Sequence, residues 1–130
     1  MLWLEVRVLS GPTTHLFGFL KLRASFRLSN LACANAIQSP VYAVGGWTDG
    51  YKNAIPRLLE RLTVPRKGLI GPWAHGYPHF ALPGPQIGFL QETLRWWDYW
   101  LKGIDTGVMD EPILRAWMTE SIKPASHHEA

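Results

Sequence analysis

The sequence predicts an α/β fold organised around a parallel strand–helix–strand unit. Val41 to Gly45 (VYAVG) is a short apolar run of the kind found in a parallel strand buried on both faces. Lys67 to Gly71 (KGLIG) is a second such run, and a helical pattern lies between the two. Parallel strands need a crossover of this kind, so we expect neighbouring parallel strands joined by a right-handed helical connection.

The connecting helix is predicted from its spacing and its boundaries. Its apolar side chains recur every three or four residues and share one face: Ile55, Leu58, Leu59 and Leu62. Asn53 is suited to cap the first turn, where Pro56 is also tolerated. Val64-Pro65 ends the helix.

The first 30 residues predict a β-hairpin. Apolar residues alternate with Trp3, Glu5 and Arg7 from Leu2 to Val8, and a second strict alternation runs from Leu20 to Leu28. Residues 11–14 (GPTT) form a turn between them.

The longest predicted helix runs from about Gln86 to Lys102, followed by Gly103 at a favourable C-terminal position. Its apolar stripe comprises Ile87, Leu90, Leu94, Trp97 and Leu101, widened by Phe89, Trp96 and Trp100. We expect the stripe to pack against the sheet, with these tryptophans in the core. Residues 76–85 precede it as a Gly- and Pro-rich loop, residues 105–112 read as a linker, and residues 113–119 could form a strand.

The amino-acid composition argues against a disordered chain, a nucleic-acid-binding protein and a membrane protein. The 130 residues are 47% hydrophobic and 18% charged, as in one ordinary globular domain. The net charge of +3 comes from scattered basic residues without interleaved aromatics, so no nucleic-acid partner is expected. No apolar run approaches about 18 residues, so no membrane partner is expected either. The single Cys33 and a poor match to a signal peptide favour a cytoplasmic chain.

Asp49 and His75 are the candidate catalytic residues. Each follows one of the two predicted parallel strands, and the carboxyl ends of such strands share the edge where ligands bind. A carboxylate beside an imidazole is two-thirds of a hydrolytic triad, and Asp before His matches the α/β-hydrolase order. Taken alone, Asp49 could equally be a turn residue and His75 a packed loop histidine.

Three motifs strengthen the catalytic interpretation: GGWTDG, GPWAH and FLQETLRWWDYWLKG. In this order and spacing, over about residues 37–118, they resemble the cocaine esterase and X-Pro dipeptidyl-peptidase family of α/β-hydrolases. The resemblance implies that Asp49 is the acid and His75 the base of a serine triad. It also implies a small-molecule ester, amide or X-Pro peptide substrate, an acyl-enzyme, and no cofactor.

The resemblance also suggests how the chain is divided. Residues 37–104 would be the C-terminal part of an α/β-hydrolase catalytic domain. Residues 105–130 would be a linker and the first strand of a truncated β (jelly-roll) domain. Residues 1–36 show no match to the motifs, and we hypothesise that the first 30 are foreign to the family, as a shifted reading frame would make them.

The chain carries no recognisable nucleophile. The chain has six serines: Ser10, Ser25, Ser29, Ser39, Ser121 and Ser126. Neither these serines nor Cys33 lies in a G-x-S-x-G-like elbow between a strand and a helix. We therefore expect the nucleophile and oxyanion hole in a missing N-terminal half, and the isolated chain to be inactive. The alternative is a non-catalytic fragment or a Trp-rich module that binds a small ligand.

Two further sets of residues have weaker signals. Trp47 and Trp73 flank the catalytic candidates and could line a substrate pocket, although core packing explains them equally well. His75 and His79 have a zinc-like spacing, but Gly76 and Pro78 exclude a helix there, so no metal site is expected.

Overall fold

The computed structural model describes residues 2–6, 19–22, 34, 37–119, 123, 125 and 126. The elements in chain order are β1 (Leu2–Val6), β2 (Phe19–Leu22), β3 (Val41–Gly46), α1 (Ala54–Arg61), β4 (Arg66–Gly71), α2 (Phe89–Lys102) and β5 (Leu114–Ala116). The described strands form one sheet in the order β2-β1-β3-β4-β5.

Parallel pairing of β3 with β4 lies at the centre of this sheet. The register runs from Val41 opposite Arg66 to Gly46 opposite Gly71. Helix α1 connects the two strands, so the predicted α/β class and strand–helix–strand unit are confirmed. Strand β3 is buried along most of its length, as expected for a strand covered on both faces.

The predicted N-terminal hairpin is confirmed where the structure describes it. Strands β1 and β2 pair antiparallel, and β1 also pairs antiparallel with β3. The remainder of the alternating segment up to Leu28 lies outside the described residues. The result is a mixed sheet with a parallel part, β3-β4-β5, and an antiparallel part.

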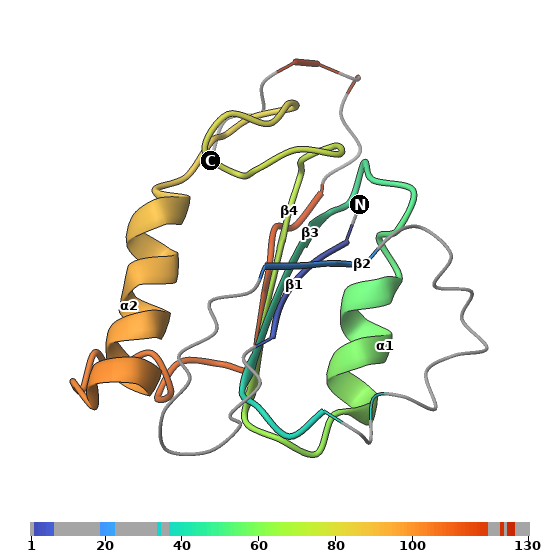
Figure 1. Ribbon diagram of the computed structural model, residues 1–130. Helices are drawn as coiled ribbons and strands as arrows, with labels where there is room; N and C mark the ends of the chain where they lie inside the picture. The colour runs from blue at the N-terminus through green and yellow to red at the C-terminus, as the bar shows by residue number, and fades with distance from the viewer. Residues whose placement is uncertain are drawn as a thin grey trace.

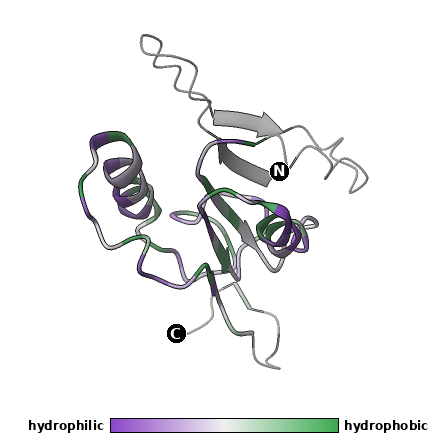
Figure 2. Ribbon diagram, turned by 90° about the horizontal axis from the view of Figure 1, so that it is seen from below, coloured by the Kyte–Doolittle hydropathy of each residue, from purple (hydrophilic) through white to green (hydrophobic). Residues whose placement is uncertain are grey.

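The two helices lie on opposite faces of the sheet (Figure 1). Alternate β3 side chains divide between them: Val41 and Ala43 pack with Ile55 and Leu58 on the α1 side. The strands lie between the two helices (Figure 2), and α1 turns its hydrophilic residues away from the sheet. Asn53 occupies the predicted N-cap position of α1, but its side chain makes no capping hydrogen bond.

On the α2 side, large aromatic rings fill the space between helix and sheet. Trp96 is 1% exposed, and its ring centroid lies 5.3 Å from that of Tyr42 on β3. Trp97 and Trp100 are partly buried against the same cluster. At the C-terminus of α2, Gly103 adopts the left-handed conformation, as its position predicted.

The predicted packing stripe of α2 is wrong in part. Leu90 and Leu94 are 61% and 54% exposed, so these two members of the stripe face away from the sheet. Apolar residues cover more of α2 than one interface can bury, and the large indole of Trp96 takes the central contact in place of the leucines. The helix also begins at Phe89 rather than Gln86.

The segment after α2 packs onto the same layers. Val108 is 1% exposed in the α2-side core, and the Lys67 ammonium donates hydrogen bonds to the Glu111 and Pro112 carbonyls. Strand β5 then adds to the sheet parallel to β4. These contacts do not test the predicted domain division at residue 105, which stays a prediction. Among the described residues, no helix combines the length and hydropathy that crossing a membrane requires.

The exposure of α2 side chains predicts unequal effects of substitution. Trp96→Ala should lower the free energy of unfolding by about 3–5 kcal/mol, because it removes a fully buried indole. Leu94→Ala should change it by no more than about 0.5 kcal/mol, since that side chain is mostly in water. Urea unfolding of both variants measures the difference, and equal losses would contradict the observed orientation of α2.

Candidate active site

Asp49 and His75 meet at the carboxyl edge of the sheet. The His75 Nδ1 atom lies 2.9 Å from Asp49 Oδ2, although the residues are 26 positions apart. Asp49 stands in the turn after β3 and His75 in the loop after β4. The predicted contact between the two side chains is therefore confirmed.

Hydrogen bonds between the two loops fix this arrangement. Backbone N–H groups of Trp47 and Thr48 donate to the carbonyls of Gly71 and Trp73 at 2.9 and 3.2 Å. The Thr48 hydroxyl adds a bond of 2.6 Å to the Pro72 carbonyl. The turn that carries Asp49 is thus attached to the segment that leads into His75.

Glycines allow these loops to approach. A Cβ atom at Gly46 would lie 1.9 Å from the Trp73 carbonyl oxygen, a backbone atom that cannot move aside. A Cβ at Gly71 would lie 2.5 Å from the Trp73 ring. The glycines of the GGW and GPW sequences are therefore required by the close packing of the two loops, whatever the role of Asp49 and His75.

The Asp49 carboxylate is shielded from solvent, whereas the His75 imidazole is open to it. The Asp49 side chain is 10% exposed and the His75 side chain 48%. The second carboxylate oxygen of Asp49 accepts a hydrogen bond of 2.9 Å from the Tyr51 backbone N–H. Because an ionised carboxylate only accepts, His75 Nδ1 must carry the donated hydrogen, and Nε2 is the nitrogen that can take up a proton.

The two tryptophans predicted to contact substrate have different environments. Trp73 is 2% exposed and lines both a pocket of about 350 Å³ and a cavity of about 20 Å³ that Asp49 also lines. The Trp47 ring packs against the α1-side core and donates its indole N–H to the Trp117 carbonyl at 2.7 Å. Their role as substrate contacts stays a prediction.

Two of the chain's serines, Ser39 and Ser126, lie within the described residues. Ser39 is buried and precedes β3, at the opposite end of that strand from Asp49. Ser126 accepts a backbone hydrogen bond from Gly84 at 2.9 Å. His79, the second histidine of the zinc-like spacing, stacks against Phe89 with 6° between the rings.

An ionic network on the α2 side was not foreseen from the sequence. Glu92 on α2 accepts hydrogen bonds from the Tyr42 hydroxyl, at 2.8 Å, and from Arg115 on β5. Burial raises the pKa of Tyr42 far above its usual range, so this hydroxyl is neutral and donates. The participants lie 50 and 23 residues apart, a separation that local sequence patterns do not register.

Two other contacts at the site also escaped prediction. Thr48 and Tyr51 lie within or beside the GGWTDG motif, and both hold the Asp49 turn in place. The Tyr51 ring centroid is 6.4 Å from that of His75. Proximity to Asp49 was the available signal for both residues.

Residues 23–77 match the family model described as X-Pro dipeptidyl-peptidase (S15 family). The predicted family resemblance is confirmed. The X-Pro dipeptidyl-peptidase match includes both Asp49 and His75. It begins at residue 23, so the hypothesis that the first 30 residues are foreign to the family is wrong for residues 23–30.

Two mycobacterial proteins are similar to this chain over 79 residues at 37% identity. They are named "Putative serine esterase Mb1866c" from Mycobacterium bovis and "Putative serine esterase MT1883" from Mycobacterium tuberculosis. Each alignment covers 55% of this chain but 13% of the relative. The chain therefore corresponds to a small part of the length of these relatives.

A substitution at Gly46 tests the close approach of the loops. Gly46→Ala should destabilise the protein by about 1–3 kcal/mol and separate Asp49 from His75, because the added methyl group overlaps the Trp73 carbonyl. Gly50→Ala is the matched control, since a Cβ there meets nothing within 4 Å. Urea unfolding and amide NMR spectra measure both effects, and a neutral Gly46→Ala would contradict the described packing.

The Asp49 carboxylate should determine the tautomer of His75. Asp49→Ala should lower the population of the Nδ1-protonated form, because the acceptor that favours it is removed. The ¹⁵N chemical shifts of the His75 ring report this population directly. Glu60→Ala, on the exposed face of α1, serves as the control. Unchanged ring shifts in Asp49→Ala would show that the carboxylate does not orient the imidazole.

Proposed function

We propose that Asp49 and His75 are the acid and base of a serine-hydrolase triad whose nucleophile lies outside this chain. The observation that supports this most strongly is their 2.9 Å contact, in which the Asp49 side chain is 10% exposed and the His75 side chain 48%. The match to the X-Pro dipeptidyl-peptidase family and the names of the two relatives agree with a serine hydrolase.

In this proposal the two residues divide the proton chemistry. His75 takes the proton from a serine hydroxyl as that oxygen attacks the substrate carbonyl, and later gives it to the leaving group. Asp49 holds the required tautomer and stabilises the imidazolium that forms. The substrate is an ester or an amide, including a peptide bond after proline, and it passes through an acyl-enzyme without a cofactor.

A second polypeptide segment completes the proposed site. It must supply a serine on a strand–turn–helix elbow and the N–H donors of an oxyanion hole. The small share of the relatives that this chain spans is compatible with such a segment. We also propose that the enzyme works in the cytoplasm, a reducing setting in which the single Cys33 needs no partner.

Reconstitution tests this proposal. The chain is co-expressed with the amino-terminal part of a related serine esterase that carries its nucleophile, and hydrolysis of p-nitrophenyl butyrate is followed. We expect turnover that requires both polypeptides and falls by about 10⁴–10⁶ in His75→Ala, since triad members act as a unit. The chain alone should show no turnover that depends on His75.

Two outcomes would contradict the proposal. Reconstituted turnover that persists in His75→Ala would mean that His75 is not the base. Labelling of a serine of the isolated chain by a fluorophosphonate, lost in His75→Ala, would mean that the nucleophile lies within these 130 residues. His79→Ala is the matched control, because that imidazole stacks on Phe89 and is expected to have no catalytic role.

A further inference from the structure

A pocket of about 350 Å³ opens on the α2 side of the sheet, at the carboxyl ends of β4 and β5. Its volume falls in the range of about 300–1,000 Å³ that is usual for small-molecule sites. Segments of β4, β5, the loop before α2 and the first turn of α2 all contribute to its lining. Neither His75 nor Asp49 is among the residues that line it, although Trp73 lines both this pocket and the small cavity beside Asp49.

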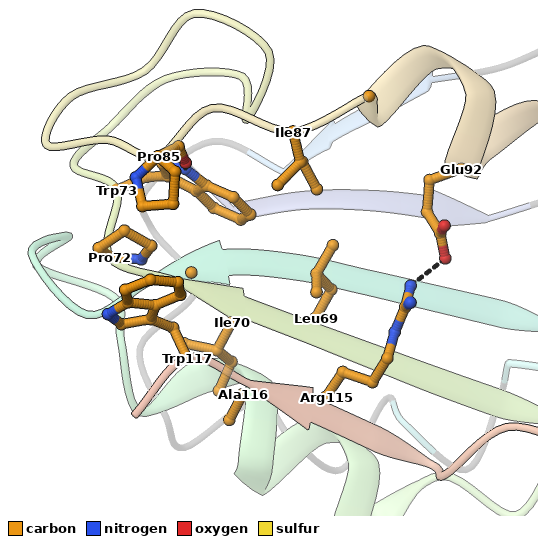
Figure 3. A pocket seen from close by; sticks show the side chains of 12 residues that line it. Leu69, Ile70, Pro72, Trp73, Pro85, Ile87, Glu92, Arg115, Ala116 and Trp117 are labelled. Atoms are coloured by element: carbon orange, nitrogen blue, oxygen red, sulfur yellow. Dashed lines mark hydrogen bonds and ion pairs between the residues drawn. The ribbon is translucent and has the colours of Figure 1, made fainter. Parts of the chain in front are cut away.

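The walls of the pocket are apolar and face one another across a slot (Figure 3). Trp73 and Ile87 lie on one side, and Leu69 and Trp117 lie on the other. The Trp73 indole is held in place because its N–H donates to the Pro85 carbonyl at 2.8 Å. Trp73 is only 2% exposed, so Trp117 is the indole that offers the slot an accessible face, and such a face suits a flat apolar ring.

One end of the slot is polar. Glu92 and Arg115 form an ion pair there, drawn as a dashed line in Figure 3. Glu92 is already engaged: Oε1 accepts from Tyr42 and Arg115, and Oε2 lies 3.5 Å from Arg95 Nη1. The glutamate therefore has little accepting capacity left for a ligand.

Arg115, in contrast, retains donors. Both of its hydrogen bonds in the described structure come from Nη2, to Tyr42 and Glu92. Its Nη1 atom lies 3.6 Å from Glu111 Oε2, too far for a good hydrogen bond. A guanidinium has five N–H donors, and this side chain is 39% exposed, so a ligand in the slot can reach it.

We propose that this slot binds a flat aromatic carboxylate, with its ring against Ile87 and Trp117 and its carboxylate on the Arg115 guanidinium. The apolar walls select the ring, and the unused guanidinium donors select an acceptor with two oxygens. The site does not depend on a nucleophile, so its occupancy is independent of the proposed hydrolase activity.

Calorimetric titration of the full chain tests the proposal with two probes of the same ring size. We expect 2-naphthoate to bind at least about tenfold more tightly than 2-naphthalenemethanol, because the alcohol cannot engage the guanidinium with two oxygens. Equal affinity for the two probes, or no binding of naphthoate, would overturn the assignment.

Variants locate the binding. Trp117→Ala should weaken both probes by about tenfold, since it removes one aromatic wall. Arg115→Lys should weaken naphthoate but leave the alcohol unchanged, because the ammonium keeps the charge and loses the planar fork. Met118→Ala, next to Trp117 but 82% exposed, and His75→Ala should bind naphthoate as the wild type does. Circular dichroism confirms folding of each variant, and loss of binding in Met118→Ala or His75→Ala would place the ligand elsewhere.

Discussion

The register between β3 and β4 determines the geometry of the whole carboxyl edge. Gly46 lies opposite Gly71, so the turn with Asp49 and the loop with His75 leave the sheet at the same level. A slip of one residue would move one loop by about 3.3 Å and exchange the faces of every β4 side chain. The 2.9 Å contact between Asp49 and His75 could not persist after such a slip. Hydrogen bonds from Trp47 and Thr48 to the β4 side extend the pairing beyond the strands.

The two faces of the sheet bury apolar area in different ways. Helix α1 packs aliphatic side chains such as Ile55 and Leu59 closely onto β3 and β4. Helix α2 covers the other face through aromatic rings such as Trp96, which bridge the wider space. The face of the sheet that α2 covers also contains polar groups, because the Tyr42–Glu92–Arg115 network connects α2 to β3 and β5. The pocket lies at the end of this layer, where the aromatic packing gives way to the loop before α2.

The central strand–helix–strand unit and the contact between Asp49 and His75 could be predicted because the sequence patterns behind them are local. An apolar run gives each strand, a 3.6-residue period gives α1, and parallel pairing then brings Asp49 to His75. The orientation of α2 could not be predicted equally well, because apolar residues occupy most of its circumference. Leu90 and Leu94 fit the same period as the residues that are buried. The Tyr42–Glu92–Arg115 network depends on pairs far apart in the sequence, for which no pattern in a single sequence is informative.

One hydrogen bond described above connects distant parts of the chain. The indole N–H of Trp47, two residues before Asp49, donates to the main-chain carbonyl of Trp117, just beyond β5. Because the acceptor belongs to the main chain, any side chain at position 117 preserves it, whereas a chain ending before that position loses it. The anchoring of the Asp49 turn therefore extends past the smallest piece that the three motifs would define. A shorter expression product ending at Gly103 would retain both titratable residues but would lack this anchor for their turn.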